Sequence, residues 1–403
     1  MPRIIPILPA GQSVPTPQAG GGEFLAPPPL SLYVHIPWCV RKCPYCDFNS
    51  HEARAEIPEA EYLAALEADI QYALPQVWGR RIVSIFFGGG TPSLLSAAGL
   101  DRLLTTIRTL LPLQPDAEIT LEANPGTAEA GKFAAFRAAG VNRLSLGIQS
   151  FSDRHLAALG RIHDGDEARR AIELAARHFD NFNLDLMYGL PEQSLDEAQA
   201  DVETALGFAP THLSCYQLTL EPNTAFAATP PELPEADRCA DMQEAIEARL
   251  AAADFTHYET SAFARPGRQC RHNLNYWQFG DYLGIGAGAH GKLTRHDGVL
   301  RQMRWKQPKQ YLAQVLAGRP VQDESIVAAA DLPFEFMMNA LRLVHGFDPA
   351  LYAERTAQAL IRIESKLRRA EADGLLDRTP GRITPTLRGQ RYLNRLLHTF
   401  LSD

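Results

Sequence analysis

The hydrophobic residues of this chain fall into short β-branched or aromatic runs, which alternate with longer segments of mixed polarity. Six of these runs predict β-strands, and they occupy residues 31–36, 81–87, 118–124, 143–149, 182–189 and 212–220. The segments between the runs predict helices, among them residues 58–74, 97–111 and 235–253. Because strand–helix units follow one another, we expect an α/β fold in which a parallel sheet, covered by helices, forms a barrel or partial barrel.

The regions outside this repeat differ in composition. Residues 1–30 are rich in proline and glycine and lack any period, which predicts a disordered tail. The repeat predicts a barrel domain over residues 31–255, and residues 256–329 predict an irregular, aromatic segment. Residues 330–403 predict helices, a hairpin and a last helix, the order of a winged-helix-like domain. Many winged helices bind DNA, but a role in packing or partner binding is the simpler interpretation here.

Composition argues against several classes of protein. The formal net charge is −8, whereas a nucleic-acid binder normally carries a basic face, so we expect no nucleic-acid partner. No apolar run approaches the roughly 20 residues that span a bilayer, and the N-terminus lacks the pattern of a signal peptide. We therefore expect a cytoplasmic protein without a transmembrane segment, and a peripheral membrane contact stays open.

Three of the six cysteines stand close together in "IPWCVRKCPYCDF", with the spacing C-x₃-C-x₂-C: Cys39, Cys43 and Cys46. In a reducing compartment such a group indicates a metal site, and thiolates select Zn²⁺, Cu(I) or iron–sulfur clusters. A zinc site would need a fourth ligand, for which His35, Asp47 or His51 is available. On a [4Fe–4S] cluster, three thiolates leave one iron open to an external ligand.

Further polar or glycine positions follow the predicted strands. The run "FFGGGTPS" places Gly88, Gly89, Gly90 and Thr91 after the second strand; a tight turn is the simplest interpretation, but missing side chains also let a ligand approach the backbone. Later strands are followed or ended by polar residues, namely Glu122, Gln149, Arg161 and Asp185. One such residue would be a helix cap or a loop ion pair, whereas several at the carboxyl ends of parallel strands indicate a ligand site.

The stretch "YVHIPWCVRKCPYC" resembles the signature of the radical S-adenosylmethionine (SAM) proteins. This resemblance implies a partial (β/α)6 TIM-like barrel, with a [4Fe–4S] cluster on Cys39, Cys43 and Cys46. The open iron would be chelated by the amino and carboxylate groups of SAM. One-electron reduction of SAM to a 5′-deoxyadenosyl radical is the chemistry of these proteins, and the cofactor supplies it.

The contexts of the polar residues resemble those of the oxygen-independent coproporphyrinogen oxidase (HemN-like) group. That likeness implies that Tyr33 and Tyr45 line the SAM pocket and that the glycine run with Thr91 faces the methionine end. It implies nucleotide contacts for four further residues: Glu122, Gln149, Arg161 and Asp185. In that group, some of the matching positions contact a second SAM molecule. Carboxylates suit ribose hydroxyls, and an arginine suits a carboxylate.

Within this group the chain resembles a haem-chaperone branch more than the oxidases. The oxidases carry a further cysteine two positions after the third, where this chain has Phe48. Residues 272–277, "HNLNYW", match the HNxxYW motif of the chaperone branch. The resemblance implies a protein that binds haem and transfers it to an acceptor protein, with a SAM-coordinated cluster. Oxidative decarboxylation of coproporphyrinogen III is the alternative, and radical chemistry on another substrate is a third.

The motif suggests how haem would be held. His272 offers an imidazole for axial ligation of iron, and Tyr276 and Trp277 offer flat faces for a porphyrin. From the residue types alone, a loop hydrogen bond for His272 and core positions for the two aromatic residues are equally natural. The resemblance to the chaperone branch favours haem binding, and it is also compatible with a homodimer.

Overall fold

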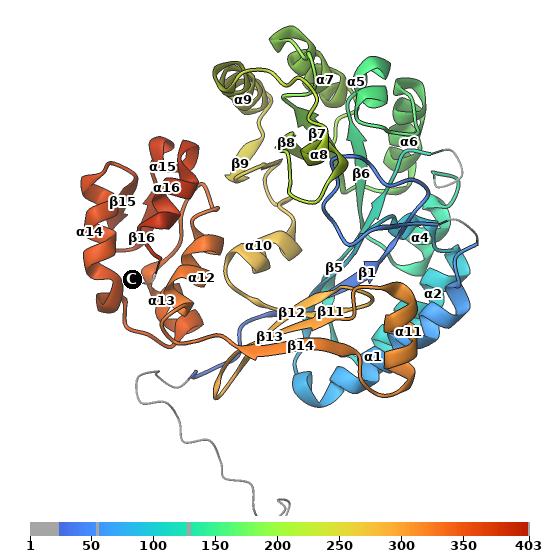
Figure 1. Cartoon of the computed structure of the whole chain (residues 1–403), viewed down its shortest axis with the longest axis horizontal. Coiled ribbons are helices and arrows are strands. Elements are labelled where there is room, and N and C mark those ends of the chain that lie inside the picture. Colours follow the sequence, from blue (N-terminus) through green and yellow to red (C-terminus); the bar gives the residue numbers. More distant parts are fainter. Residues whose placement is uncertain (1–23, 54–55, 127–129, 402–403) are drawn as a thin grey trace, which may run out of the picture.

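The computed structural model describes residues 24–53, 56–126 and 130–401 (Figure 1). Most of the tail expected over residues 1–30 therefore lies outside the described residues, and the described chain enters its first strand at Leu30. All six predicted strands are present: β1 (Leu30–Ile36), β4 (Ile82–Gly89), β5 (Leu113–Ala123), β6 (Arg143–Gln149), β7 (Phe182–Tyr188) and β8 (His212–Gln217).

Helices connect these strands, and the three predicted ones are confirmed as α1 (Glu59–Val77), α2 (Ala97–Leu110) and α9 (Ala236–Ala251). The others are η1 (Pro92–Leu94), α4 (Phe133–Ala139), α5 (Asp153–Ala158), α6 (Gly165–His178), α7 (Leu195–Gly207) and α8 (Ala225–Ala228). Helix α1 continues beyond its predicted end because Pro75 lies in its last turn, where a proline removes only one hydrogen bond.

The strands belong to one mixed sheet of 12 strands in the order β14-β13-β12-β11-β1-β4-β5-β6-β7-β8-β10-β9. Pairing is parallel from β11 (Asp281–Ile285) to β8 and antiparallel toward both edges. Figure 1 shows the sheet curving from β14 around to β9. The described strands do not close into a complete barrel, which agrees with the predicted partial barrel.

The prediction of an irregular segment over residues 256–329 is wrong. These residues form regular elements: β9 (Thr256–Glu259), β10 (Ala262–Ala264), α10 (Arg271–Trp277), β11, β12 (His290–Arg295), β13 (Gly298–Arg304), α11 (Pro308–Leu316) and β14 (Val321–Ile326). Strand β11 pairs with β1, about 250 residues earlier in the chain. A short strand followed by a glycine-rich turn carries little local signal, so this pairing depends on contacts between distant parts of the sequence.

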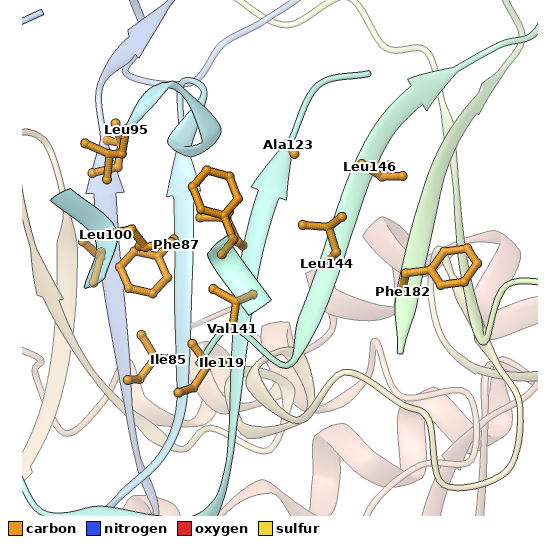
Figure 2. Packing of buried hydrophobic residues seen from close by; sticks show 14 of the residues in the cluster. Ile85, Phe87, Leu95, Leu100, Ile119, Ala123, Val141, Leu144, Leu146 and Phe182 are labelled. Carbon is orange, nitrogen blue, oxygen red and sulfur yellow. The ribbon is translucent and has the colours of Figure 1, made fainter. Parts of the chain in front are cut away.

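The two faces of the sheet have different chemistry. On the outer face, apolar side chains pack against the helices, as Figure 2 shows for Ile85, Phe87, Leu144 and Leu100. On the inner face, neighbouring strands carry buried polar residues that hydrogen-bond to one another; Ser31 contacts Ser84, and Asn183 bridges Ser145 and Ser214. The interior of the curved sheet is therefore polar, which suits a ligand site.

The C-terminal residues form a separate helical unit with a hairpin, in the predicted winged-helix-like order. Its elements are α12 (Leu332–Ala340), α13 (Pro349–Thr356), η2 (Leu360–Ile363), α14 (Glu364–Ala372), β15 (Leu376–Thr379), β16 (Arg382–Pro385), α15 (Leu387–Arg391) and α16 (Leu393–His398). Phe336, Leu367 and Leu396 belong to a second apolar core, which Phe279 and Val299 join, and the unit lies beside α10 (Figure 1).

In the part of the chain that the structure describes, no helix is both long and apolar enough to cross a membrane.

Candidate SAM and iron–sulfur site

The three clustered cysteines lie on the loop that leaves β1 at the carboxyl end of the sheet. Cys39 belongs to β2 (Trp38–Cys39), which pairs with β3 (His51–Glu52), and a turn between them carries Cys43 and Cys46. Lys42 fixes this turn by donating to the carbonyl oxygens of Phe48 and Ser50 at 3.3 and 3.2 Å. The local chain therefore holds three partly exposed thiols on one short, hydrogen-bonded loop.

The thiols differ in their surroundings. Burial raises the pKa of Cys39, and the other two thiols raise it further, while a hydrogen bond from Thr91 opposes the shift. The guanidinium of Arg161 donates to the Cys43 sulfur at 3.5 Å, a contact that suits a negatively charged sulfur ligand. No described group of His, Cys, Asp and Glu side chains surrounds a position for a single metal ion. A cubane cluster spreads its thiolates over different irons, so separated thiols are no obstacle to it.

The glycine run at the end of β4 packs tightly against this loop. Gly89 has φ +114°, and a Cβ there would lie 2.5 Å from the His35 ring. A Cβ on Gly90 would lie 2.5 Å from the carbonyl oxygen of Trp38, and the Gly90 amide donates to Ile36 at 2.7 Å. The run therefore ends strand β4 and bends at Gly90, and Gly89 and Gly90 also border the cavity described next.

A cavity of about 300 Å³ opens beside the thiols, inside the curve of the sheet. This volume lies at the lower end of the range for small-molecule sites, roughly 300–1,000 Å³. The lining includes eleven of the residues predicted from the sequence: Cys39, Cys43, Tyr45, Cys46, Gly89, Gly90, Thr91, Glu122, Gln149, Arg161 and Asp185. Residues distant in sequence are brought together because the carboxyl ends of parallel strands meet at one edge of a sheet.

Two carboxyl groups face this cavity from β5 and β7. The pKa of Glu122 is raised to about 8, mainly by burial and also by the charge of Asp185; the Gly89 amide and the Arg143 guanidinium oppose this shift. Burial also raises the pKa of Asp185, against hydrogen bonds from Asn183 and other polar neighbours. At neutral pH these surroundings favour a protonated Glu122, and a cationic ligand would favour the ionised form.

A hydrogen-bonded chain crosses the cavity wall. Arg161 donates to Asn124 Oδ1 at 2.6 Å and to the Gly147 carbonyl at 2.9 Å, and Asn124 donates to the Thr91 hydroxyl at 3.0 Å. Gln149 lies at the end of β6 with φ +69°, a strained conformation for a residue other than glycine. The Nε atom of Arg161 is buried and lacks a hydrogen-bond partner within the described ranges.

Sequence analysis missed several lining residues, among them Asn124, Ser145, Gly147 and Tyr216. Asn124 had a usable signal, because it follows the β5 strand within "LEANPG". The others lie inside strands, where only the inward direction of the side chain or backbone gives them a role.

Three predicted residues do not line this cavity: Tyr33, Gly88 and His272. Tyr33 lies next to the site, since a Cβ on Gly88 would touch both its ring, at 3.0 Å, and Glu122, at 3.2 Å. His272 is 7% exposed on α10, with Nδ1 3.2 Å from the Ser84 hydroxyl and its ring beside Phe86. In this conformation its side chain has the hydrogen bond and the burial of an interior histidine.

Comparison with known proteins bears on the interpretation of this site. Residues 33–205 match the radical SAM superfamily, and residues 327–392 match the HemN C-terminal domain. The chain is 49% identical to the haem chaperone HemW of Escherichia coli (strain K12) over 378 residues, covering 93% of this chain and 99% of that protein. It is 34% identical to the haem chaperone HemW of Bacillus subtilis (strain 168), with the same coverage.

The chain belongs to the HemW family. Its fold is similar to that of a solved HemN structure. The coproporphyrinogen III oxidase HemN from Escherichia coli, described as a radical SAM enzyme, superposes with a TM-score of 0.79 at 25% identity, covering 93% of this chain and 90% of the other.

Membership of the radical SAM superfamily implies a [4Fe–4S] cluster and SAM for this HemW-family protein. The residues present fit both groups. Soft sulfur ligands lie on one loop, and the adjacent cavity offers carboxyl groups, an open backbone at the glycine run and an unpartnered guanidinium nitrogen among the described residues. No part of this fit depends on the C-terminal unit, since none of its residues line the cavity.

Proposed function

We propose that this protein binds haem and transfers it to an acceptor protein, while a SAM-coordinated [4Fe–4S] cluster occupies the site beside β1. The observation that carries the proposal is the likeness, over 93% of the chain, to proteins named haem chaperones. The cysteine loop supports it, because Phe48 stands where the oxidases carry a further cysteine, and its side chain is 61% exposed at the cavity.

For the cofactor site we propose the following roles. Cys39, Cys43 and Cys46 would hold the cluster, and SAM would complete its coordination through the amino and carboxylate groups. The cluster supplies one-electron chemistry when it is bound. The glycine run gives the methionine end of SAM access to backbone groups, with Thr91 beside it. Tyr45 would contact the ligand from the cavity wall, and Tyr33 would support the site from its place next to Gly88.

The remaining polar residues would contact the nucleotide and the charged end of SAM. Glu122 and Asp185 offer acceptors to ribose hydroxyls or to a cationic group, and Gln149 points its amide into the cavity from a strained backbone. Arg161 keeps an unpartnered Nε among the described residues, which would donate to an acceptor on the ligand.

The haem contacts of HNLNYW remain predictions. As an axial ligand His272 could keep its Nδ1 contact with Ser84 and use Nε2, but its side chain would have to become accessible from a buried position. We infer that the protein acts in the cytoplasm on an acceptor whose identity the site does not specify. A homodimer stays a prediction from family likeness.

Anaerobic haem titration of the reconstituted protein, run beside a turnover assay, tests the proposed function. We expect a Soret shift that saturates with haem, and no protoporphyrinogen IX from coproporphyrinogen III with SAM and a reductant. Without a spectral change at saturating haem the chaperone proposal fails. Clear turnover would instead assign the protein to the oxidases, whose fold it shares.

A further inference from the structure

A second cavity lies on the inner face of the sheet, between strands β11, β12, β13 and β14. It has a volume of about 110 Å³, and its walls include Tyr282, His290, Arg301, Met303 and Asp323. Tyr282 is in register with Ser31 of β1, which places it on the polar inner face. His290 and Met303 pair across β12 and β13, so their side chains project from the same face of the sheet.

The His290 imidazole is available for coordination. Its side chain is exposed, and partial burial together with the cations Lys306 and Arg301 lowers its pKa from 6.5. A lowered pKa keeps the imidazole neutral at physiological pH, the form that binds iron. His272, by contrast, is 7% exposed and hydrogen-bonded to Ser84.

The walls of this cavity, and Tyr276 next to the wall residue Tyr282, carry groups that complement a porphyrin. The rings of Tyr276 and Tyr282 stack with centroids 4.6 Å apart, and their hydroxyl groups are 3.0 Å apart. Arg301 donates to the Tyr282 hydroxyl at 2.7 Å and pairs with Glu335 of α12. A guanidinium suits a propionate, flat aromatic groups suit a macrocycle, and the Met303 thioether adapts to an irregular apolar surface.

In this geometry the helix α10, which carries HNLNYW, contacts the second cavity through Tyr276 and not through His272. Tyr276, the fifth residue of the motif, reaches the second cavity through its contact with Tyr282. His272, its first residue, instead faces Ser84 and Phe86 on the neighbouring part of the sheet. The motif therefore supports the wall of the cavity, and the imidazole in that wall comes from β12.

The second cavity lies close to the SAM cavity. A Cβ on Gly284 would come within 2.0 Å of the His290 carbonyl oxygen, and Gly284 is in register with Tyr33 of β1. His290 also contributes to lowering the pKa of His35, whose ring contacts Gly89 of the glycine run. A ligand at His290 would therefore be a neighbour of a ligand in the SAM cavity.

We propose that His290 is the axial ligand of the haem that this protein carries, with the Tyr276–Tyr282 pair beside the macrocycle and Arg301 facing a propionate. This inference rests on the proposed function. A cavity of about 110 Å³ holds only part of a ligand, so most of the haem lies over its mouth. One protein ligand on an open surface leaves the other face of the iron free for a ligand of the acceptor, which suits transfer.

The test is an anaerobic titration of the full-length, cluster-loaded protein with ferric haem, followed by absorbance and EPR. His290→Ala and the closer isostere His290→Gln should lose the spectrum of an imidazole-ligated haem and weaken haem binding about tenfold or more. Free imidazole should restore the spectrum of His290→Ala. His296→Ala is the matched control, since His296 is an exposed residue of the same β12–β13 hairpin, and it should behave like the wild type.

The results separate this inference from the proposed function. A wild-type protein that gives no haem spectrum refutes haem carriage itself. A wild-type protein that binds haem, with His290 variants that keep its spectrum and affinity, refutes only the assignment of His290. If His272→Ala lost the imidazole signature while the His290 variants kept it, the axial ligand would be His272 on α10. Retained SAM binding in the His290 variants confirms that they fold.

Discussion

At the scale of single residues, the cavity beside the thiols holds partly buried carboxyl groups, and this burial disfavours their charged forms. The pKa of Glu122 rises to about 8 through burial and the charge of Asp185. Carboxyl groups with raised pKa values are common at functional sites, where a ligand later supplies the missing partner. The raised pKa should therefore appear in the pH dependence of the free energy of unfolding of SAM-free protein.

Replacement of Glu122 should change the pH dependence of stability. The folded-state pKa, about 8, lies above the ordinary value of 4.5, so the unfolded chain ionises first. The stability contributed by the protonated carboxyl is complete below about pH 4.5 and is lost as the pH rises through about 8. The Glu122→Gln variant has no carboxyl group to ionise and does not lose this stability. Between pH 4.5 and pH 8 its free energy of unfolding should rise relative to that of the wild type by about 1 kcal/mol or more.

Urea unfolding of the SAM-free protein across this pH range measures the difference. Glu173→Gln, an exposed position on α6, is the control and should follow the wild type. If the free energies of unfolding of Glu122→Gln and the wild type changed in parallel with pH, the raised pKa would be contradicted.

The sulfur ligands can be separated from the other cysteines by single substitutions. Cys43→Ala should abolish the brown cluster absorbance and the bound iron, because a cluster on two protein thiolates is poorly held. Cys239→Ala, on α9, removes a buried cysteine outside the cavity lining and should keep both signals. A full cubane spectrum in Cys43→Ala would show that another residue holds the iron.

At the scale of elements, the site depends on how the end of β4 fits against the loop after β1. The register of β1 and β4 runs as far as Ile36 and Gly89, and backbone hydrogen bonds continue it into the cysteine loop. Gly89 combines a positive φ with a ring of His35 where a Cβ would lie. The glycine is therefore required by both backbone conformation and space.

Gly89→Ala should weaken SAM binding and destabilise the protein. Backbone strain at φ +114° costs about 1–2 kcal/mol, and the added methyl group displaces His35 as well. Gly79→Ala is the matched control, because Gly79 also has a positive φ, +76°, but nothing lies within 4 Å of its would-be Cβ. Isothermal titration with SAM should therefore show a loss for Gly89→Ala alone, whereas equal SAM affinities in both variants would contradict the close packing.

At the scale of the whole molecule, the C-terminal unit contacts both ends of the curved sheet. Toward β9, Arg391 of α15 makes two hydrogen bonds of 2.6 Å to Glu247 of α9, and Leu343 forms a bridge with Glu259. Toward β13, Glu335 pairs with Arg301. The unit thus spans the opening between the two edges of the sheet.

Glu247→Ala should loosen the contact near β9 while the rest of the fold persists. The ion pair is bidentate and each side chain is 20% exposed, so its loss should cost about 1 kcal/mol. Amide hydrogen exchange in α15 and α16 should become faster, with the strands β1 to β7 unchanged. Asp241→Ala, an exposed acidic residue of the same helix without a hydrogen bond to Arg391 among the described contacts, is the control. Unchanged exchange in α15 and α16 would show that the ion pair does not hold this unit.

Much of this protein was accessible from sequence alone, because the signals involved are local. Alternating apolar and polar segments predicted the six central strands and their helices, since burial on one face imposes a period on each element. The cysteine spacing and the glycine run predicted the cluster loop and its neighbour, since both depend on residues close together in the chain.

Tertiary structure decided the features that depend on distant pairing. The place of β11 beside β1 has no local signal, and neither has the second cavity, whose walls come from β11, β12, β13 and β14. The same holds for exposure: His272 has a motif in the sequence but is buried, whereas His290 has none and is exposed. The sequence determines the type and spacing of each residue. Its accessibility depends on which side chains pack over it, and only the folded molecule determines that packing.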